Sequence, residues 1–74
     1  MDAIIHAGFE SEELTVERDM TVSELIDIIV EHVDSFQEAM AAAEILNPIW
    51  NSGSYEGTGW RVWFVRPEPT PILH

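Results

Sequence analysis

The residues with the greatest capacity for chemistry in this chain are its carboxylates. The 74-residue sequence has 14 Asp and Glu against 3 Arg and no Lys, which gives a formal net charge of -11. Five acids recur three or four residues apart, at Glu24, Asp27, Glu31, Asp34 and Glu38. On a helix of 3.6 residues per turn, this spacing places them on one side within an arc of about 80°. They would form a line of negative charges about 21 Å long at 1.5 Å per residue.

Such a line is a coarse match to a nucleic-acid backbone. One strand of DNA presents a phosphate about every 3.4 Å of axis, and the predicted carboxylates lie about 5 Å apart. Exposed helix faces usually interleave Lys with Glu, because i,i+4 pairs stabilise the helix. No Lys or Arg is spaced to form such a pair with any of these five acids. Two interpretations stay open: a surface that serves solubility or salt adaptation, and a surface that binds a basic partner.

The same acids do not have the pattern of a catalytic or metal site. A calcium loop would show an Asp-x-Asp-x-Asp-Gly run, and a general acid–base pair needs two carboxylates in contrasting environments across a cleft. His6, His32 and His74 are not spaced for ligation, and the chain has no Cys. We therefore expect no catalytic residue, no metal and no cofactor, and we predict that the protein is not an enzyme.

The glycine-rich segment 53–59 is not a phosphate-binding loop. No Gly-Lys-Ser/Thr follows it, and the next predicted element is a strand instead of a helix N-terminus. The Gly-x-Ser-x-Gly pattern of a hydrolase nucleophile is also not matched. We predict that residues 51–59 form a flexible connection.

Tryptophans supply a second kind of candidate. We expect Trp50, Trp60 and Trp63 to lie mostly in the core, yet a domain this small cannot easily enclose three indoles. One face of Trp60 or Trp63 is therefore expected to stay exposed as an anchor, flanked by Arg61 and Arg66. We assign Trp63 to the partner contact.

Local patterns predict a hairpin followed by helix. Residues 3–9 are apolar and residues 14–18 alternate, which is typical of two strands with one solvated face. Thr21-Val22-Ser23-Glu24 has the form of a capping box, so a helix should begin there, with its apolar arc from Val22 to Met40 facing the core. A second Ser-x-x-Glu signature at Ser35 leaves open whether there is one long helix or two shorter ones.

The last predicted element is a strand over residues 60–66, which is rich in aromatic and β-branched side chains and is expected to be central and covered by helix on one face. The predicted fold class is α+β, with a small antiparallel sheet of three or four strands and one long or two shorter helices on one face, in β-β-α-β order. Residues 1–66 are predicted to form a single compact domain, and residues 67–74 an extended Pro-rich tail.

Charge and hydropathy limit the partners and the location. Direct binding to nucleic acid or to anionic lipid needs cations, which this chain lacks. No basic n-region and no long apolar run follow Met1, so we expect neither a signal peptide nor a membrane span. We predict a cytoplasmic protein without a membrane partner, and we leave its oligomeric state open.

Two resemblances extend these expectations. The strand, turn and strand followed by Thr21-Val22-Ser23-Glu24-Leu25 are similar to the opening of ubiquitin-like β-grasp domains, over roughly half of the chain. Conjugating members of that family end in Gly-Gly, whereas this sequence ends Pro71-Ile72-Leu73-His74, so no conjugation or sulfur-carrier role is implied. In size and charge, without a shared motif, the chain also resembles phage-encoded inhibitors of nucleic-acid enzymes, including anti-restriction and anti-CRISPR proteins.

The second resemblance implies a DNA-mimic inhibitor. Its partner would be a basic nucleic-acid-handling protein, such as a CRISPR effector or a restriction enzyme, in the host cytoplasm if the chain is phage-encoded. The expected contact residues are the phosphate-like row Glu24, Asp27, Glu31, Asp34 and Glu38, with Glu12, Glu13 and Glu17 in support. Trp63 is a further partner-binding candidate, which an adaptor would use. The alternative is a ubiquitin-like adaptor that docks through its sheet and exposed Trp, with acidity only for solubility.

Overall fold

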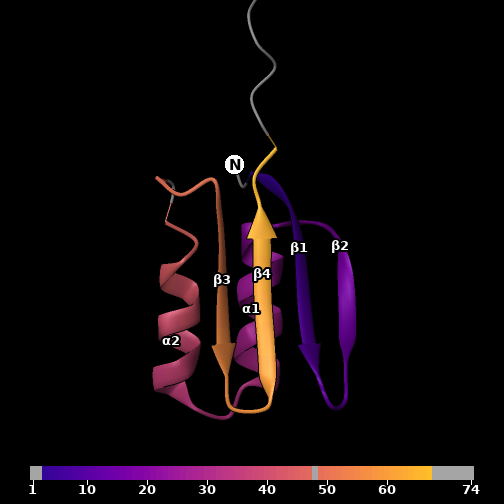
Figure 1. Ribbon diagram of the computed structural model, residues 1–74, viewed down its shortest axis with the longest axis vertical. Helices are drawn as coiled ribbons and strands as arrows, with labels where there is room; N and C mark the ends of the chain where they lie inside the picture. The colour runs from indigo at the N-terminus through magenta and orange to yellow at the C-terminus, as the bar shows by residue number, and fades with distance from the viewer. Residues whose placement is uncertain (1–2, 48, 68–74) are drawn as a thin grey trace, which may run out of the picture.

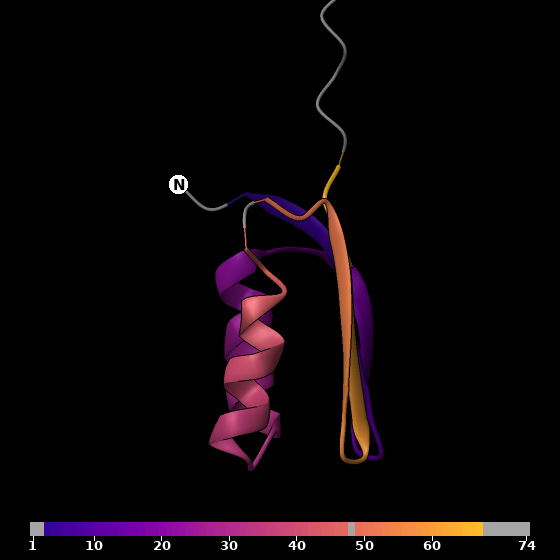
Figure 2. The same cartoon turned by 60° about the vertical axis from the view of Figure 1, so that its left-hand side comes forward.

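The computed structural model describes residues 3–47 and 49–67. The elements follow in the order β1 (Ile4–Ser11), β2 (Thr15–Thr21), α1 (Val22–His32), α2 (Phe36–Glu44), β3 (Ser52–Gly57) and β4 (Trp60–Val65) (Figure 1). The strands form one antiparallel sheet in the order β2-β1-β4-β3. Both helices lie on the same face of this sheet, as Figure 2 shows. The α+β fold class is confirmed, and the four strands and two shorter helices lie within the predicted numbers. The observed order, β-β-α-α-β-β, agrees only roughly with the predicted β-β-α-β.

Each helix begins where the sequence supplies a cap. The Thr21 hydroxyl accepts from the Glu24 backbone N–H at 3.1 Å, and the Glu24 carboxylate accepts from the Thr21 N–H in return. The chain is extended at Val33 and again at Ser35, whose hydroxyl accepts from the Glu38 N–H at 3.2 Å. The helix therefore breaks at Ser35, and α1 and α2 run in opposite directions (Figure 1).

The core lies between the sheet and the helices. Alternate residues of the two central strands point toward the helices, because side chains on a strand alternate between its faces. These positions and the helix positions above them are buried: Ile5, Ala7, Phe9, Val62, Phe64, Leu25, Ile29 and Ala42. The strand predicted at residues 60–66 is β4, and it is central and helix-covered as expected.

β3 corrects the prediction of a flexible connection over residues 51–59. It pairs along its length with β4, with Gly53 opposite Phe64 and Gly57 opposite Trp60. A Cβ at either glycine would collide with the ring opposite it. The glycines thus make room for aromatic rings that cover the edge strand, and this packing compensates for the low strand propensity of glycine.

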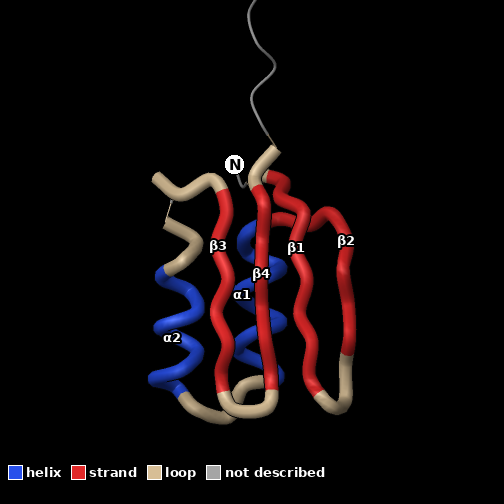
Figure 3. Tube along the Cα trace, viewed as in Figure 1, coloured by secondary structure: helices blue, strands red, loops and turns tan. Residues whose placement is uncertain are grey.

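Three short connections lie at the same end of the molecule (Figure 3). They are residues 12–14 between β1 and β2, residues 33–35 between α1 and α2, and Thr58-Gly59 between β3 and β4. Gly59 has a φ of 79°, a left-handed conformation that glycine adopts without steric cost. We call this end the turn end. Residues 68–74 of the predicted tail lie outside the described residues.

Candidate functional site

The middle of the predicted acidic row is exposed. Asp27 and Glu31 lie on the solvent side of α1, and Asp34 lies in the loop that follows it. None of these three carboxylates forms an ion pair with a described residue. These three side chains are therefore exposed, and no described residue neutralises their negative charge by an ion pair.

The first member of the row, Glu24, is engaged within the fold. Its carboxylate accepts from the Arg18 guanidinium at 3.0 Å while it also completes the cap of α1. The hydrogen bond from Arg18, followed by that from the Thr21 backbone, holds the pKa of Glu24 below its ordinary value. Glu24 thus stays ionised, but its negative charge is already paired with Arg18.

The last member, Glu38, belongs to the second helix and turns toward the β3–β4 hairpin. Its two oxygens accept from the Trp60 indole N–H and the Thr58 hydroxyl, each at 3.0 Å. These two hydrogen bonds, in that order, lower the pKa of Glu38. The prediction of one unbroken line on a single rod is therefore wrong, because α1 ends at His32 and both outer carboxylates are engaged in the fold.

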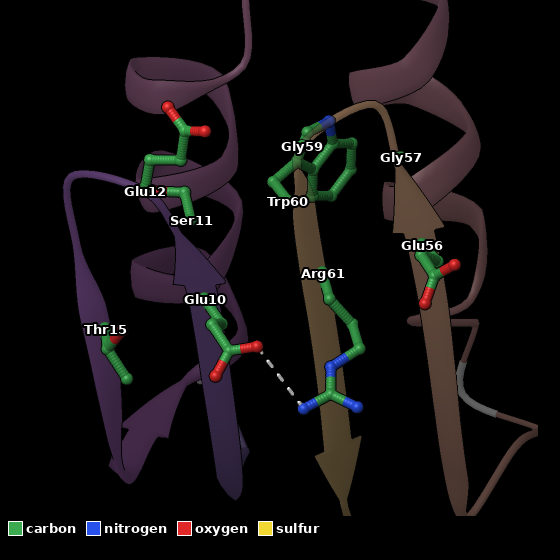
Figure 4. A pocket seen from close by; sticks show the side chains of 9 residues that line it. All are labelled: Glu10, Ser11, Glu12, Thr15, Glu56, Gly57, Gly59, Trp60 and Arg61. Carbon is green, nitrogen blue, oxygen red and sulfur yellow. Dashed lines mark ion pairs between the residues drawn. The ribbon is translucent and has the colours of Figure 1, made fainter.

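Further carboxylates gather at the turn end. Glu12 and Glu13 are exposed in the β1–β2 turn, as predicted for supporting charges. An open hollow over the strand ends is lined by Glu10, Glu12, Glu56 and Arg61. Figure 4 shows Glu10 and Glu56 on the strands either side of Arg61, with Glu12 beyond the end of β1. Arg61 forms an ion pair with Glu10, with 3.6 Å between Nη2 and Oε1. One cation among three carboxylates leaves this hollow negative.

The third supporting residue, Glu17, has a partner on the uncovered face of the sheet. His6 lies between Glu17 and Asp19, with its Nε2 3.2 Å from Glu17 Oε2 and its Nδ1 2.9 Å from Asp19 Oδ1. The hydrogen bond to Asp19, followed by that to Glu17, raises the pKa of His6. When His6 is protonated, it partly neutralises this pair of acids.

Trp63 lies on the same uncovered face and is partly exposed, whereas Trp60 is buried. The Trp63 ring rests on Gly8 of the neighbouring strand, and the Arg61 guanidinium lies 4.8 Å from its centroid. Trp63 thus packs against Gly8 and Arg61 and stays partly exposed, as suits an anchor.

Arg66 does not flank Trp63, contrary to prediction. It donates to the carbonyls of Leu46 and Trp50, each at 2.8 Å, and its guanidinium lies 5.4 Å from the ring centroid of Phe64. Because Leu46 directly follows the last turn of α2, Arg66 supplies donors to the carbonyl end of that helix. Arg66 therefore serves to stabilise the fold.

Sequence reasoning missed the exposure of Val30, Phe36 and Met40. A single helix would have placed Phe36 and Met40 with the core residues, but the break at Ser35 turns α2 relative to α1. Val30 belongs to α1 itself, in which Leu25 and Ile29 are the buried residues. The second Ser-x-x-Glu signature, at Ser35, was the sequence signal that a new helix begins there with its apolar face in a different direction.

The described residues, 3–47 and 49–67, contain no cluster of three His, Cys, Asp or Glu side chains suited to holding a metal ion. Across the same residues, neither helix has the length and apolar character needed to traverse a bilayer. No family model, curated protein or solved structure matches the chain. Charge and geometry are therefore the basis for assigning a function.

Proposed function

We propose that this protein is a non-enzymatic inhibitor that places its carboxylates in the basic nucleic-acid site of another protein. The observation that carries this proposal is that all three arginines are engaged in contacts within the fold. Arg18 pairs with Glu24, Arg61 pairs with Glu10, and Arg66 serves backbone carbonyls. The remaining acidic surface therefore has no arginine to neutralise it.

The uncompensated charge is concentrated on α1 and at the turn end. Glu38 is hydrogen-bonded to Thr58 and Trp60. Among the described residues, the other carboxylates without an ion pair are Glu12, Glu13, Asp27, Glu31, Asp34, Glu44 and Glu56. Asp27, Glu31 and Asp34 supply the phosphate-like row, now three groups long, and the two glutamates of the β1–β2 turn extend it at the same end of the molecule.

The mechanism is competition by charge. A cationic groove that has evolved for phosphates would accept these carboxylates, and nucleic acid would then be excluded from it. Opposite fields attract the two proteins before contact, so association is expected to be fast and to weaken as salt screens the charges. A CRISPR effector or a restriction enzyme has the required kind of groove.

The experiment combines capture with competition. Proteins retained by the immobilised chain at low salt and released at high salt are purified, and their binding to labelled duplex DNA and to single-stranded RNA is measured with and without the chain. We expect the chain to displace the nucleic acid. Asp27→Lys combined with Glu31→Lys should weaken this inhibition about tenfold or more, because each reversal places like charges together.

A charge-matched control distinguishes the effect of the row Asp27, Glu31 and Asp34 from the effect of net charge alone. Asp19→Lys makes the same change in charge as Asp27→Lys, but at an exposed residue outside the predicted contact residues. It should leave inhibition within about threefold, whereas Asp27→Lys should weaken it more. Inhibition that survives the reversal at Asp27 and Glu31, or that is indifferent to salt, would contradict the proposal. Circular dichroism of each variant verifies that the fold is intact.

The second candidate is an adaptor that docks through the uncovered face of the sheet. The packing of the partly exposed Trp63 against Gly8 and Arg61 favours it, because aromatic anchors often dominate protein interfaces. Trp63→Ala distinguishes the two functions once folding has been verified. An adaptor would lose its partner, whereas charge-driven inhibition would change less than about threefold.

A further inference from the structure

The helix layer has an apolar groove on the side away from the sheet. Three of its residues are largely exposed: Phe36 at 76%, Val30 at 65% and Met40 at 52% of their full surface. They line one hollow between α1 and α2, together with the smaller Ala39 and Ala43. Large exposed apolar side chains gathered at one place usually mark a binding surface.

The groove continues along the helix pair. Ile26 and Ala43 line both this hollow and a second one, which extends to Val22 and Leu46. The 11 residues of α1 correspond to about 16 Å at 1.5 Å per residue, or about three helical turns. The length and shape suit one helix lying along the two.

The ionisable residues of the groove are all acidic. Asp34 lines the hollow near the turn end, and Glu44 lines the hollow at the opposite end of the helix pair. No Lys, Arg or His among the described residues lines either hollow. An occupant should therefore combine an apolar strip with positive charge at its borders.

We propose that this groove binds a basic amphipathic helix of another protein. Apolar side chains at i, i+3 or i+4, and i+7 would lie among Val30, Phe36 and Met40, and Lys or Arg beside them would face Asp34 and Glu44. A second copy of the chain is a poor occupant, since each copy carries a net charge of -11 and presents the same acids. The inference does not depend on nucleic-acid mimicry, because the apolar groove would serve any partner with such a helix.

The test uses synthetic peptides as probes of the full chain. A labelled 14-residue peptide of Leu and Lys, with Leu at helical spacing, is titrated with the protein, and anisotropy gives the dissociation constant. We expect binding with backbone amide NMR shifts confined mainly to α1 and α2. A Leu/Glu peptide with the same apolar strip, and a Leu/Lys peptide of scrambled order, should each bind about tenfold more weakly or worse.

Matched variants locate the contact. Met40→Ser should weaken binding of the Leu/Lys peptide about fivefold or more. Val65→Ser removes an apolar side chain of nearly equal exposure, 51%, from the uncovered sheet face and should leave binding within about twofold. Asp34→Asn with Glu44→Gln should also weaken binding, and more than Glu12→Gln with Glu13→Gln, which removes the same charge at the turn end.

Three results would overturn the proposal. The first is equal binding of the Leu/Glu and Leu/Lys peptides, and the second is unchanged affinity in Met40→Ser. The third is a dimer in light scattering that Met40→Ser converts to a monomer, since a second copy would then occupy the groove. Met40 and Val65 are both exposed, so circular dichroism of these variants should match that of the native chain.

Discussion

The indole N–H of Trp60 donates to the carboxylate of Glu38 at 3.0 Å, across 22 positions of the chain. The other oxygen of Glu38 accepts from Thr58, so one carboxylate joins the first turn of α2 to the β3–β4 hairpin. It also satisfies the polar group of a buried indole, which would otherwise lose its hydrogen bond to water. Glu38 is therefore a structural residue more than a surface charge.

Glu38→Gln is expected to destabilise the protein at pH 7. The pKa of Glu38 is lowered from an unfolded value of 4.5, so its contribution to stability is present above about pH 4.5 and is lost as the pH falls through the folded pKa. The urea midpoint of the variant should lie below that of the native chain at pH 7. The gap should narrow as the pH falls below 4.5.

Glu31→Gln is the matched control for this prediction. It makes the same chemical change at an exposed carboxylate without an ion pair to a described residue. Since it relieves repulsion among like charges, its urea midpoint at pH 7 should equal or exceed the native one. Equal losses in the two variants would show that Glu38 has no special place in the fold.

Gly8→Ala should displace Trp63. A Cβ at this position would occupy the space of the indole ring, and overpacking of this kind costs about 1–3 kcal/mol. We expect a lower free energy of unfolding in urea together with a changed near-ultraviolet circular dichroism signal. Ser54→Ala, opposite Trp63 on the edge strand, should change stability by less than about 0.5 kcal/mol. A Gly8→Ala protein with native stability and spectrum would refute this packing.

His6 should make stability depend on pH. Its pKa is raised above the unfolded value of 6.5 by Asp19 and Glu17, so its contribution is fully present below pH 6.5 and is lost as the pH rises through the folded pKa. His6→Gln should therefore have a lower urea midpoint than the native chain at pH 5.5. The two midpoints should converge at pH 8.5, and a gap that is the same at both pH values would rule out the protonated histidine as its cause.

Local signals in the sequence were sufficient for the helix starts and for the last strand. Thr21 and Ser35 act within one turn of the chain, so their caps can be recognised without a fold. The run from Trp60 to Val65 has strong strand propensity on both faces, which is typical of a covered central strand.

Two of the failures involve contacts between distant segments. β3 is a strand because Gly53 and Gly57 receive rings from β4, and propensity alone predicts a loop there. Likewise, the engagement of Glu38 depends on the place of Trp60, which spacing along a helix cannot reveal. For the acidic site, the sequence identified the exposed Asp27, Glu31 and Asp34. It did not reveal that Glu24 and Glu38 are engaged in contacts within the fold.

The position of β4 has a consequence for how the chain folds. β4 is the last strand of the described chain, yet it is the strand that joins β1 to β3, with Val65 opposite His6. During synthesis, the β1–β2 hairpin and β3 therefore cannot join in one sheet until β4, which ends at Val65, has left the ribosome. Folding to the native sheet must wait for this late and non-local pairing, which makes it slower than the formation of either helix.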